Sequence, residues 1–543
     1  MKIYVSAKEI FIHYDQRSID KYRLQLSKHV RTLFPAGTYQ DSITVRKIIE
    51  TYYDWCADTF QKIVFAHNDM LFVNYLFAYH ESSILLWMRT LAKEDLQTKF
   101  GISEEDLSLN RRIFKLALEQ ACGINYTNSR SASKELIQQY DKVIEDLLYI
   151  GEELYHAAYF IAELRIIPDS LQAVIEVDGL LHITRKGDLE PVFNALFSKM
   201  KEDFEKGIMD TEGVKQLKDE IQKCFGIDYD FAAHQIVHIK KHHNPKNWEF
   251  QTIEPGILVQ NLVHNGVSQK NAENFYNGLT LNKENKLSLK NSVYKVNSME
   301  RHFFRPILEI SQNGKRRQLI GIEKWGESVT VLATNNFQWN KAPDEWKESK
   351  CFQQYLERKS DEHDSLLEDE VVKVLKESQI PFFRNITSFS DGKKSVSINI
   401  AGVGEIDFIW LDTKRDRIVV ADCKYNRARY DMIAFSADFS NFKDSYEKKI
   451  ANKAKWIDEN RDIVCKHFET KFPGLNIDIE QYEIEELFII NTPTFYMYMN
   501  RVNTVCFFNL EEFILNSYMH PDLVLNIKSG NKITIKIKSY PYF

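Results

Sequence analysis

The stretch from Val403 to Tyr425, VGEIDFIWLDTKRDRIVVADCKY, predicts two adjacent β-strands. The first strand bears Asp407, and the second is apolar until Asp422, with Lys424 two residues further on. Successive side chains of a strand point to opposite faces, so Asp422 and Lys424 share a face and Cys423 points away. Two acids and a lysine at the end of a buried hairpin are costly unless they bind a partner. We expect that partner to be a divalent cation beside a phosphodiester.

The chain is too long for a single hydrophobic core. Its 543 residues predict roughly two to four domains, and a composition of 44% hydrophobic and 27% charged residues is typical of globular proteins. The net charge is −6. This charge argues against a protein that coats nucleic acid, but it is compatible with a nuclease, because metal ions and a local basic groove can supply the positive field.

The seven cysteines are too widely spaced for a Cys-x-x-Cys metal site, and their number is odd. This usage predicts reduced thiols and a cytoplasmic protein. The first 15 residues carry charges within their apolar run, so we expect no signal peptide there. Residues 70–88 are the most membrane-like, but they include Asn74, His80 and Glu81. They therefore predict a buried helix of an aromatic-rich core, and we expect no membrane partner.

The order of helical and extended patterns predicts a multidomain chain. Residues 1–168 are mostly α and resemble a helical bundle, residues 169–358 are mixed α+β, and residues 359–543 form an α/β core. The third domain is expected to begin in the charged stretch 359–364. Within the middle domain, Asn313-Gly314 between two apolar runs predicts a hairpin. We expect helices in that domain at about 188–206, 211–223 and 229–241.

The third domain has a predicted order of elements that surrounds the two acids. We expect a helix at 365–378, strands at 381–389, 396–411 and 417–425, a helix at about 443–468, and a strand at 484–492. The strand at 396–411 could be bent at Gly402 and Gly404. In the first helix an apolar stripe runs from Leu367 to Leu375. Glu368 lies at one edge of this stripe and Glu370 flanks the other side. One of them can reach the site of Asp407 and Asp422, and we prefer Glu368.

This order resembles the PD-(D/E)XK phosphodiesterase superfamily, also called restriction-endonuclease-like. The matching pieces are Glu368 in LLEDEVVKVL, Asp407 in GEIDFIW, and Asp422 with Lys424 in VVADCKY. The resemblance covers only about residues 360–500, and Ile406 stands where the motif has a proline. The Asp-x-Lys-Tyr ending is also similar to the nuclease subunit of McrBC-type restriction systems. The first 350 residues resemble no family that we can name.

The expected chemistry is that of a Mg²⁺-dependent endonuclease, with Mn²⁺ as the alternative ion. Asp407 and Asp422 would hold the ion through oxygen ligands, and Lys424 would orient the attacking water and stabilise the transition state. The resemblance further implies the backbone carbonyl of Cys423 as a metal ligand. It also implies Glu368 as an outer ligand or as a ligand of a second ion.

Several lysines of the following predicted helix could contact phosphates. They are Lys443, Lys448, Lys449, Lys453 and Lys455. Acidic residues interleave with them and follow close behind, so a solvated helix face is the interpretation that we favour for most of the five.

Two hypotheses of different classes follow. The first is a metal-dependent nuclease that acts on DNA rather than RNA, with N-terminal domains that recognise the target or a partner. By analogy alone, this suits a prokaryotic restriction or phage-defence effector that works with a separate ATPase, another defence subunit or a second copy of the chain. The second is a nucleic-acid-binding or complex-assembly protein with an inert nuclease-like domain. No ATPase is expected within the chain, because Asp391-Gly-Lys-Lys-Ser395 lacks the upstream glycine of a P-loop.

Overall fold

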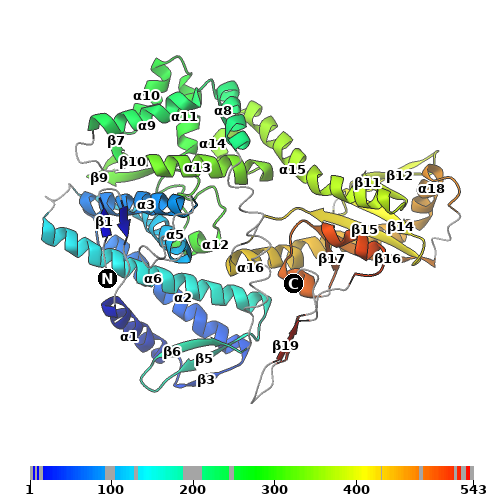
Figure 1. Cartoon of the computed structure of the whole chain (residues 1–543), viewed down its shortest axis with the longest axis horizontal. Coiled ribbons are helices and arrows are strands. Elements are labelled where there is room, and N and C mark those ends of the chain that lie inside the picture. Colours follow the sequence, from blue (N-terminus) through cyan, green and yellow to red (C-terminus); the bar gives the residue numbers. More distant parts are fainter. Residues whose placement is uncertain are drawn as a thin grey trace. The chain divides into compact units, whose positions relative to one another are not determined.

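The computed structural model describes residues 4–6, 9–11, 16–91, 104–127, 133–186, 211–243, 250–400, 402–427, 429, 431–475, 481–499, 501–518, 523–526 and 534–537. The chain divides into two compact units. Unit 1 comprises Met1–Ile161, Leu171–Thr184 and Ile208–Ser360, and unit 2 comprises Ala162–Ser170, Arg185–Gly207 and Asp361–Phe543. Helices and strands occur in both units (Figure 1), which confirms the predicted mixed character of the chain. The division into three domains stays a prediction.

Unit 1 is built mainly from helices. Its first part contains α1 (Gln16–Leu33), α2 (Ser42–Phe65), α3 (Met70–Leu91), α5 (Glu104–Ala121) and α6 (Lys134–Ile166) up to Ile161. Its second part contains α8 (Thr211–Phe225), α9 (Tyr229–His243), α10 (Ile257–His264), α11 (Gln269–Gly278), α12 (Leu289–Tyr294), α13 (Ile322–Asn335) and α14 (Asp344–Lys347). The helices predicted at 211–223 and 229–241 correspond to α8 and α9. The helix predicted at 188–206 lies outside the described residues.

A five-stranded sheet joins segments that are far apart in the sequence of unit 1. Its order is β4 (Asn125–Tyr126), β9 (Ile307–Gln312), β10 (Lys315–Gly321) and β7 (Phe250–Ile253), and β8 (Thr280–Leu281) also pairs with β9. The predicted hairpin is confirmed, because β9 and β10 are antiparallel and turn at Asn313 and Gly314, which both have positive φ. Smaller sheets are β3 (Gly37–Tyr39) with β5 (Leu171–Ile175) and β6 (Leu181–Arg185), and β1 (Tyr4–Ser6) with β2 (Glu9–Phe11).

Helix α3 corresponds to the most membrane-like stretch of the sequence. It is buried over most of its length, and even His80 and Glu81 are fully inaccessible to solvent. This confirms the prediction of a buried helix within an aromatic-rich core. Within the part of the chain that the structure describes, no helix has both the length and the apolar character that crossing a bilayer requires.

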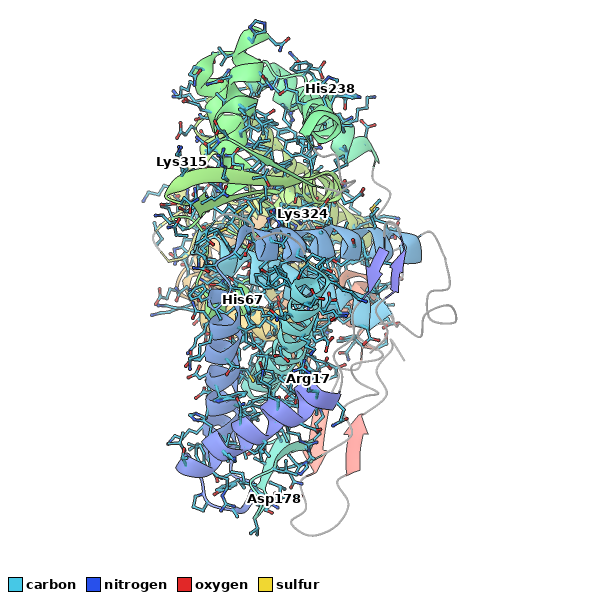
Figure 2. The ribbon with its side chains drawn as sticks, turned by 90° about the vertical axis from the view of Figure 1, so that its left-hand side faces the viewer. Arg17, His67, Asp178, His238, Lys315 and Lys324 are labelled. Atoms are coloured by element: carbon cyan, nitrogen blue, oxygen red, sulfur yellow. A yellow bond between two sulfur atoms is a disulfide. The ribbon has the colours of Figure 1, made fainter. Side chains whose placement is uncertain are left out.

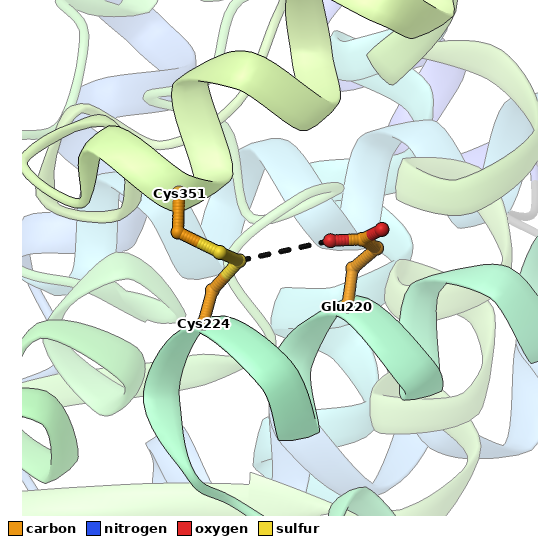
Figure 3. Close-up of side chains that lie close together, drawn as sticks. All are labelled: Glu220, Cys224 and Cys351. Atoms are coloured by element: carbon orange, nitrogen blue, oxygen red, sulfur yellow. Dashed lines mark hydrogen bonds between the residues drawn. A yellow bond between two sulfur atoms is a disulfide. The ribbon is translucent and has the colours of Figure 1, made fainter.

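The expectation that every cysteine is reduced is wrong for two of the seven. Cys224 of α8 and Cys351 of α15 (Lys350–Glu377) form a disulfide, with their Cα atoms 5.4 Å apart (Figure 3). They are separated by 127 residues in the chain, so spacing could not indicate the pair. Glu220 lies 3.7 Å from the Cys224 sulfur. Among the described residues, these three form the one group of at least three clustered side chains with metal-ligating atoms, but sulfurs joined to each other are not thiolate ligands.

Unit 2 contains a five-stranded mixed sheet (Figure 1). Its order is β11 (Phe382–Ile386), β14 (Ile406–Asp412), β15 (Arg417–Lys424), β16 (Glu483–Ile490) and β17 (Asn503–Cys506). The first three strands are antiparallel neighbours, and β15, β16 and β17 are parallel. A parallel pair needs a crossover connection. Between β15 and β16 it contains α16 (Met432–Asn441), α17 (Glu447–Glu459) and α18 (Arg461–Lys471).

Each face of this sheet has its own apolar core. On one face, Leu367, Val371 and Leu375 of α15 pack with Trp410 and Val419 of the central strands. On the other face, the alternate strand residues Ile409, Leu411, Ile418 and Val420 pack with Trp456 and Ile457 of α17 and with Val464 and Phe468 of α18. The strict alternation of β14 and β15 between the two cores explains why both strands are apolar on both sides.

Several predicted helix and strand bounds within the third domain are wrong. The helix predicted at 365–378 is α15, which begins at Lys350, so the charged stretch 359–364 lies inside a helix, although unit 1 passes into unit 2 in this stretch. The strand predicted at 396–411 is two strands, β13 (Ser395–Ser397) and β14, separated by a turn in which Gly402 and Gly404 have positive φ. The strand predicted at 381–389 is likewise divided into β11 and β12 (Ser388–Ser390). The helix predicted at 443–468 is divided between α17 and α18, and it is preceded by a π-helical turn, η2 (Phe442–Tyr446).

The chain also contains short elements after the central sheet. They are α19 (Leu510–Ile514), β18 (Leu523–Asn526) and β19 (Thr534–Ile537), of which the last two form an antiparallel pair.

Candidate metal centre

The candidate site lies where β14 and β15 stop pairing. Their antiparallel register runs from Asp412 opposite Arg417 to Phe408 opposite Ala421. Beyond this last pair, the backbone N–H of Cys423 donates to the Asp407 carboxylate at 2.8 Å. A buried N–H needs a hydrogen-bond acceptor. Here the acceptor is the side chain of Asp407 in place of a backbone carbonyl of β14. The carboxylate of Asp407 is thereby held beside the end of β15.

The carboxylates of Asp407 and Asp422 converge on the same two ammonium groups. Lys424 Nζ lies 3.3 Å from Asp422 Oδ2 and 3.9 Å from Asp407 Oδ2. Lys453 Nζ of α17 lies 2.5 Å from Asp422 Oδ1 and 3.9 Å from Asp407 Oδ1. Lys424 also donates to the backbone carbonyl of Cys423 at 3.1 Å. The predicted acids, lysine and carbonyl therefore lie together.

Lys453 is a site residue that sequence reasoning did not single out. It is 6% exposed, whereas Lys443, Lys448, Lys449 and Lys455 are all exposed. A signal for it exists in the sequence, because Lys453 lies three residues after Ile450 and four before Ile457, which are both buried. That spacing puts the lysine on the sheet-facing side of α17.

Burial and the two lysines act in opposite directions on the pKa of Asp407. Burial raises the pKa of Asp407 to about 6, and the charge of Asp422 adds to the shift. The two lysines and the N–H of Cys423 oppose it. Burial lowers the pKa of Lys424, but Asp422 and Asp407 more than offset this, and the net shift is upward. Lys424 is therefore a fixed positive charge at neutral pH.

Two further contacts hold the end of β15 and its lysine. The Lys424 ammonium lies 5.4 Å from the ring centroid of Tyr446, which the π-helical turn η2 presents to it. The backbone N–H of Asn426 donates to the Asn491 side chain at 2.6 Å, and the Asn491 amide returns a hydrogen bond to the Asn426 carbonyl at 3.0 Å. This reciprocal pair ties the chain after Lys424 to the end of β16.

The turn that leads into β14 is fixed to the helix that carries Lys453. Asn452 Nδ2 donates to the carbonyl of Gly402 at 2.7 Å. Because Asn452 and Lys453 are neighbours on α17, this bond sets the position of the turn relative to the site. The start of β14, and with it the position of Asp407, is therefore fixed relative to α17.

Glu368 does not lie in the same cluster as the two aspartates. It faces Arg384 of β11, whose Nε lies 2.8 Å from Glu368 Oε2, and Arg384 also pairs with Asp369 at 2.6 Å. Burial, followed by the charges of Asp407 and Glu368, raises the pKa of the Cys423 thiol. Glu368 is thus close enough to Cys423 to influence its ionisation, on the side of β15 that faces α15.

Glu370, the alternative helix acid, is exposed, whereas Glu368 is partly buried. Within the described chain, no third acid joins Asp407 and Asp422 in a group whose ligand atoms all lie within 4.8 Å of one another. A ligand role for Glu368 stays a prediction.

The donor set fits a small divalent cation. Carboxylate and carbonyl oxygens are the ligands that Mg²⁺ prefers, and Asp407, Asp422 and the Cys423 carbonyl supply them. The two carboxylates already approach shared positive charges from adjacent strands. The ion would lie among these oxygens, and Lys424 and Lys453 would be its cationic neighbours.

Metal affinity should depend on pH through Asp407. Its pKa of about 6 means that the carboxylate form, which binds metal, predominates above pH 6 and is lost below it. Because one proton must leave before the ion binds, we expect the Kd for Mn²⁺ to rise by about tenfold per pH unit below pH 6. Isothermal titration between pH 5.0 and 7.5 would measure this, and an unchanged Kd across the range would contradict it.

Comparisons with protein-family models, with curated proteins and with solved structures each gave no match to this chain.

Proposed function

We propose that the chain is a metal-dependent nuclease that cleaves phosphodiester bonds of nucleic acid, DNA in preference to RNA. One observation carries the proposal: the carboxylates of Asp407 and Asp422 converge, with Lys424 beside both, at the point where two central strands stop pairing. This is costly to maintain in a protein interior without a ligand.

The architecture of unit 2 supports a restriction-endonuclease-like core. A mixed sheet has its acids on adjacent antiparallel strands, a parallel strand follows after a helical crossover, and an acid-bearing helix covers one face. The order of these elements is the one expected from the sequence motif. The assignment to the PD-(D/E)XK superfamily remains part of the proposal.

Each residue of the site has its own role in the proposed reaction. Asp407, Asp422 and the Cys423 carbonyl would hold Mg²⁺ or Mn²⁺, with Glu368 as an outer ligand. When bound, the ion would act as a Lewis acid toward the phosphate and lower the pKa of a coordinated water. Lys424, whose charge is fixed by the two acids, would orient the attacking water and stabilise the negative charge that builds on the phosphate oxygens. Tyr446 would hold Lys424 in place.

The proposal is tested by incubating the purified full-length chain with single- and double-stranded DNA and RNA. Each substrate is offered with Mg²⁺, with Mn²⁺ and with EDTA. We expect DNA cleavage that requires the metal. Failure to cleave any of the four substrates with either ion would overturn the proposal.

A second function, a nucleic-acid-binding or assembly protein with an inert nuclease-like unit, is favoured by a specific observation. The charges of the site are mutually compensated: Lys424 and Lys453 pair with the two aspartates, and Arg384 pairs with Glu368. Such a set can exist as a structural ion-pair network. This function predicts that the chain binds nucleic acid in a mobility-shift assay while the cleavage assay stays negative with both ions.

Lys453 should compete with the metal ion. Its ammonium contacts both acids, so an incoming divalent cation meets a positive charge within about 4 Å, which costs about 8 kcal/mol at an effective dielectric constant of about 20. Side-chain movement relieves part of this cost. We expect Lys453→Met to lower the Kd for Mn²⁺ by about tenfold in a calorimetric titration. Lys455→Met, an exposed lysine of the same helix, is the control, and an unchanged or raised Kd for the Lys453 variant would refute the competition.

The biological role is proposed by analogy alone. A prokaryotic restriction or phage-defence effector, located in the cytoplasm, would use unit 1 to recognise its target or a partner. A separate ATPase, another defence subunit or a second copy of the chain are the candidate protein partners.

A further inference from the structure

Unit 1 contains a second concentration of buried charge, distinct in sequence from the candidate metal centre. It lies where α3, α5, α13 and the segment before β9 meet, and Figure 2 labels one of its members, Lys324. We call it the buried cationic cluster. Its members are His80, Glu81, Arg111, Lys115, Glu119, Arg301, His302, Lys324 and Glu327.

Two of its acids are fully engaged by side chains. Glu119 accepts from Arg301 Nε at 2.8 and 2.9 Å and from the backbone N–H of His302 at 2.9 Å. Glu327 pairs with Lys324, and it lies 3.1 Å from Arg111. The negative charges of Glu119 and Glu327 are therefore already compensated by neighbouring cations.

The third acid is held by the backbone. Glu81 accepts from the N–H groups of Glu323 and Lys324 in the first turn of α13, at 3.1 and 3.0 Å. The positive end of a helix suits this position. Burial nevertheless raises the pKa of Glu81 to about 8, so the carboxyl contributes little negative charge at neutral pH.

The other groups of the cluster, Lys115 and the two histidine rings, form no ion pair with the residues that the structure describes, although Glu119 and Glu327 act on Lys115 electrostatically. Among the described residues, the Lys115 ammonium lies over the Phe303 ring at 4.3 Å and belongs to none of the ion pairs of the cluster. Both ring nitrogens of His80 and Nε2 of His302 are buried with no hydrogen-bond partner. His80 is fully buried, and the neighbours that lower its pKa include the cations Lys324, Lys115 and Arg111.

The cluster has more basic than acidic residues. The cluster contains four basic residues, Arg111, Lys115, Arg301 and Lys324, against three acids. Burial, together with the neighbouring cations, lowers the pKa values of His80 and Lys115. Buried polar groups without a hydrogen-bond partner are destabilising, so the cluster lacks a negatively charged, hydrogen-bond-accepting partner. A metal ion would worsen the repulsion.

We propose that the buried cationic cluster of unit 1 is a binding site for a tetrahedral oxyanion, the phosphate group of a small molecule or inorganic phosphate. Such a group can accept hydrogen bonds from several directions, which suits donors on α3, α5 and the segment before β9. Arg111 and Lys115 are the outermost cations. The Arg111 side chain is 16% exposed and Lys115 is partly exposed, so an anion would meet these two first.

Binding should be accompanied by proton uptake, because an anion favours the charged forms of Lys115, His80 and His302. The other titratable groups that face them are Glu81, Glu119, Glu327, Lys324, Arg111 and Arg301, and all six already form ion pairs or hydrogen bonds. Sulfate is a suitable probe for this effect, since it does not itself titrate near neutral pH.

The test is isothermal titration of the full-length chain at pH 7.0 with sodium phosphate and sodium sulfate, against sodium chloride at matched ionic strength. We expect saturable binding of both oxyanions, none of chloride, and a sulfate enthalpy that depends on the ionisation heat of the buffer. Lys115→Met should weaken binding at least tenfold, and Lys47→Met, an exposed lysine of α2, should not change it.

Two further variants guard against misfolding and separate this proposal from the nuclease proposal. If Lys115→Met does not fold, His80→Gln replaces it and should also weaken binding at least tenfold. Asp422→Asn, in unit 2, should bind the oxyanions as the wild type does, which separates this proposal from the nuclease proposal. No saturable binding by the wild type, or equal loss in Lys47→Met and Lys115→Met, would overturn the inference.

Discussion

Asp422→Asn should lower the rate of metal-dependent cleavage by about a thousandfold, which corresponds to about 4 kcal/mol of transition-state stabilisation. Asp422 is 1% exposed, lies at the end of β15, and contacts both lysines of the site. The asparagine keeps the volume of the side chain but removes the charge that holds the cation. Single-turnover cleavage of labelled DNA measures the rate, and loss of calorimetric Mn²⁺ binding measures the cause separately.

Lys424→Ala should reduce cleavage about as strongly, by a factor of about 10² to 10³, but should leave Mn²⁺ binding in place, because lysine is not a metal ligand. The matched control is Lys455→Ala, which removes an exposed lysine whose partner is Glu459 at 3.7 Å. Circular dichroism and thermal melting confirm folding of each variant. Cleavage at the wild-type rate by both the Asp422 and the Lys424 variants would refute the active site.

The second large effect concerns stability. Gly321→Ala should destabilise the chain by about 3 kcal/mol, because overpacking costs about 1–3 kcal/mol and a displaced buried carboxyl adds to it. A Cβ atom at Gly321 would overlap the carboxyl group of Glu81. That carboxyl caps the first turn of α13, through the N–H groups of Glu323 and Lys324. Since φ of Gly321 is −116°, the penalty is steric and does not come from backbone strain.

Gly326→Ala is the matched control for this prediction. Gly326 lies within α13, is exposed, and has nothing within 4 Å of an added Cβ. Alanine in a helix interior is favoured over glycine by about 0.5–1 kcal/mol. The two substitutions should therefore shift the denaturant midpoint in opposite directions. Equal shifts would show that the contact between Glu81 and α13 is not the cause.

Much of the local structure around the candidate site could be predicted from the sequence. The alternation in VGEIDFIW and RIVVADCK predicts two strands and the common face of Asp422 and Lys424, and the structure has both strands. The start of β14 was harder to place, because β13 already ends at Ser397 and Gly402 and Gly404 adopt positive φ in the turn before β14. Helix α15 was predicted too short, since the charged stretch 359–364 suits an exposed helix face as well as a linker.

The partners of the site residues were much less predictable. Lys453 and four other lysines have the same chemistry, and only the packing of α17 on the sheet distinguishes the buried one from the exposed four. Glu368 was expected beside the two aspartates, but it pairs with Arg384 on the face that α15 covers. A helical stripe indicates which side of a helix is buried, but not which distant side chain meets it.

The sequence by itself determined the elements and the residue types of the site, because strand alternation and helical spacing are local properties with fixed periods. It placed Asp407, Asp422 and Lys424 near one another through a single hairpin. Only the tertiary structure decided the pairs made across long separations: Lys453 with Asp422, Cys224 with Cys351, and Glu119 with Arg301. The physical reason is that such pairs depend on how buried faces pack, and burial makes their charges and hydrogen bonds matter most.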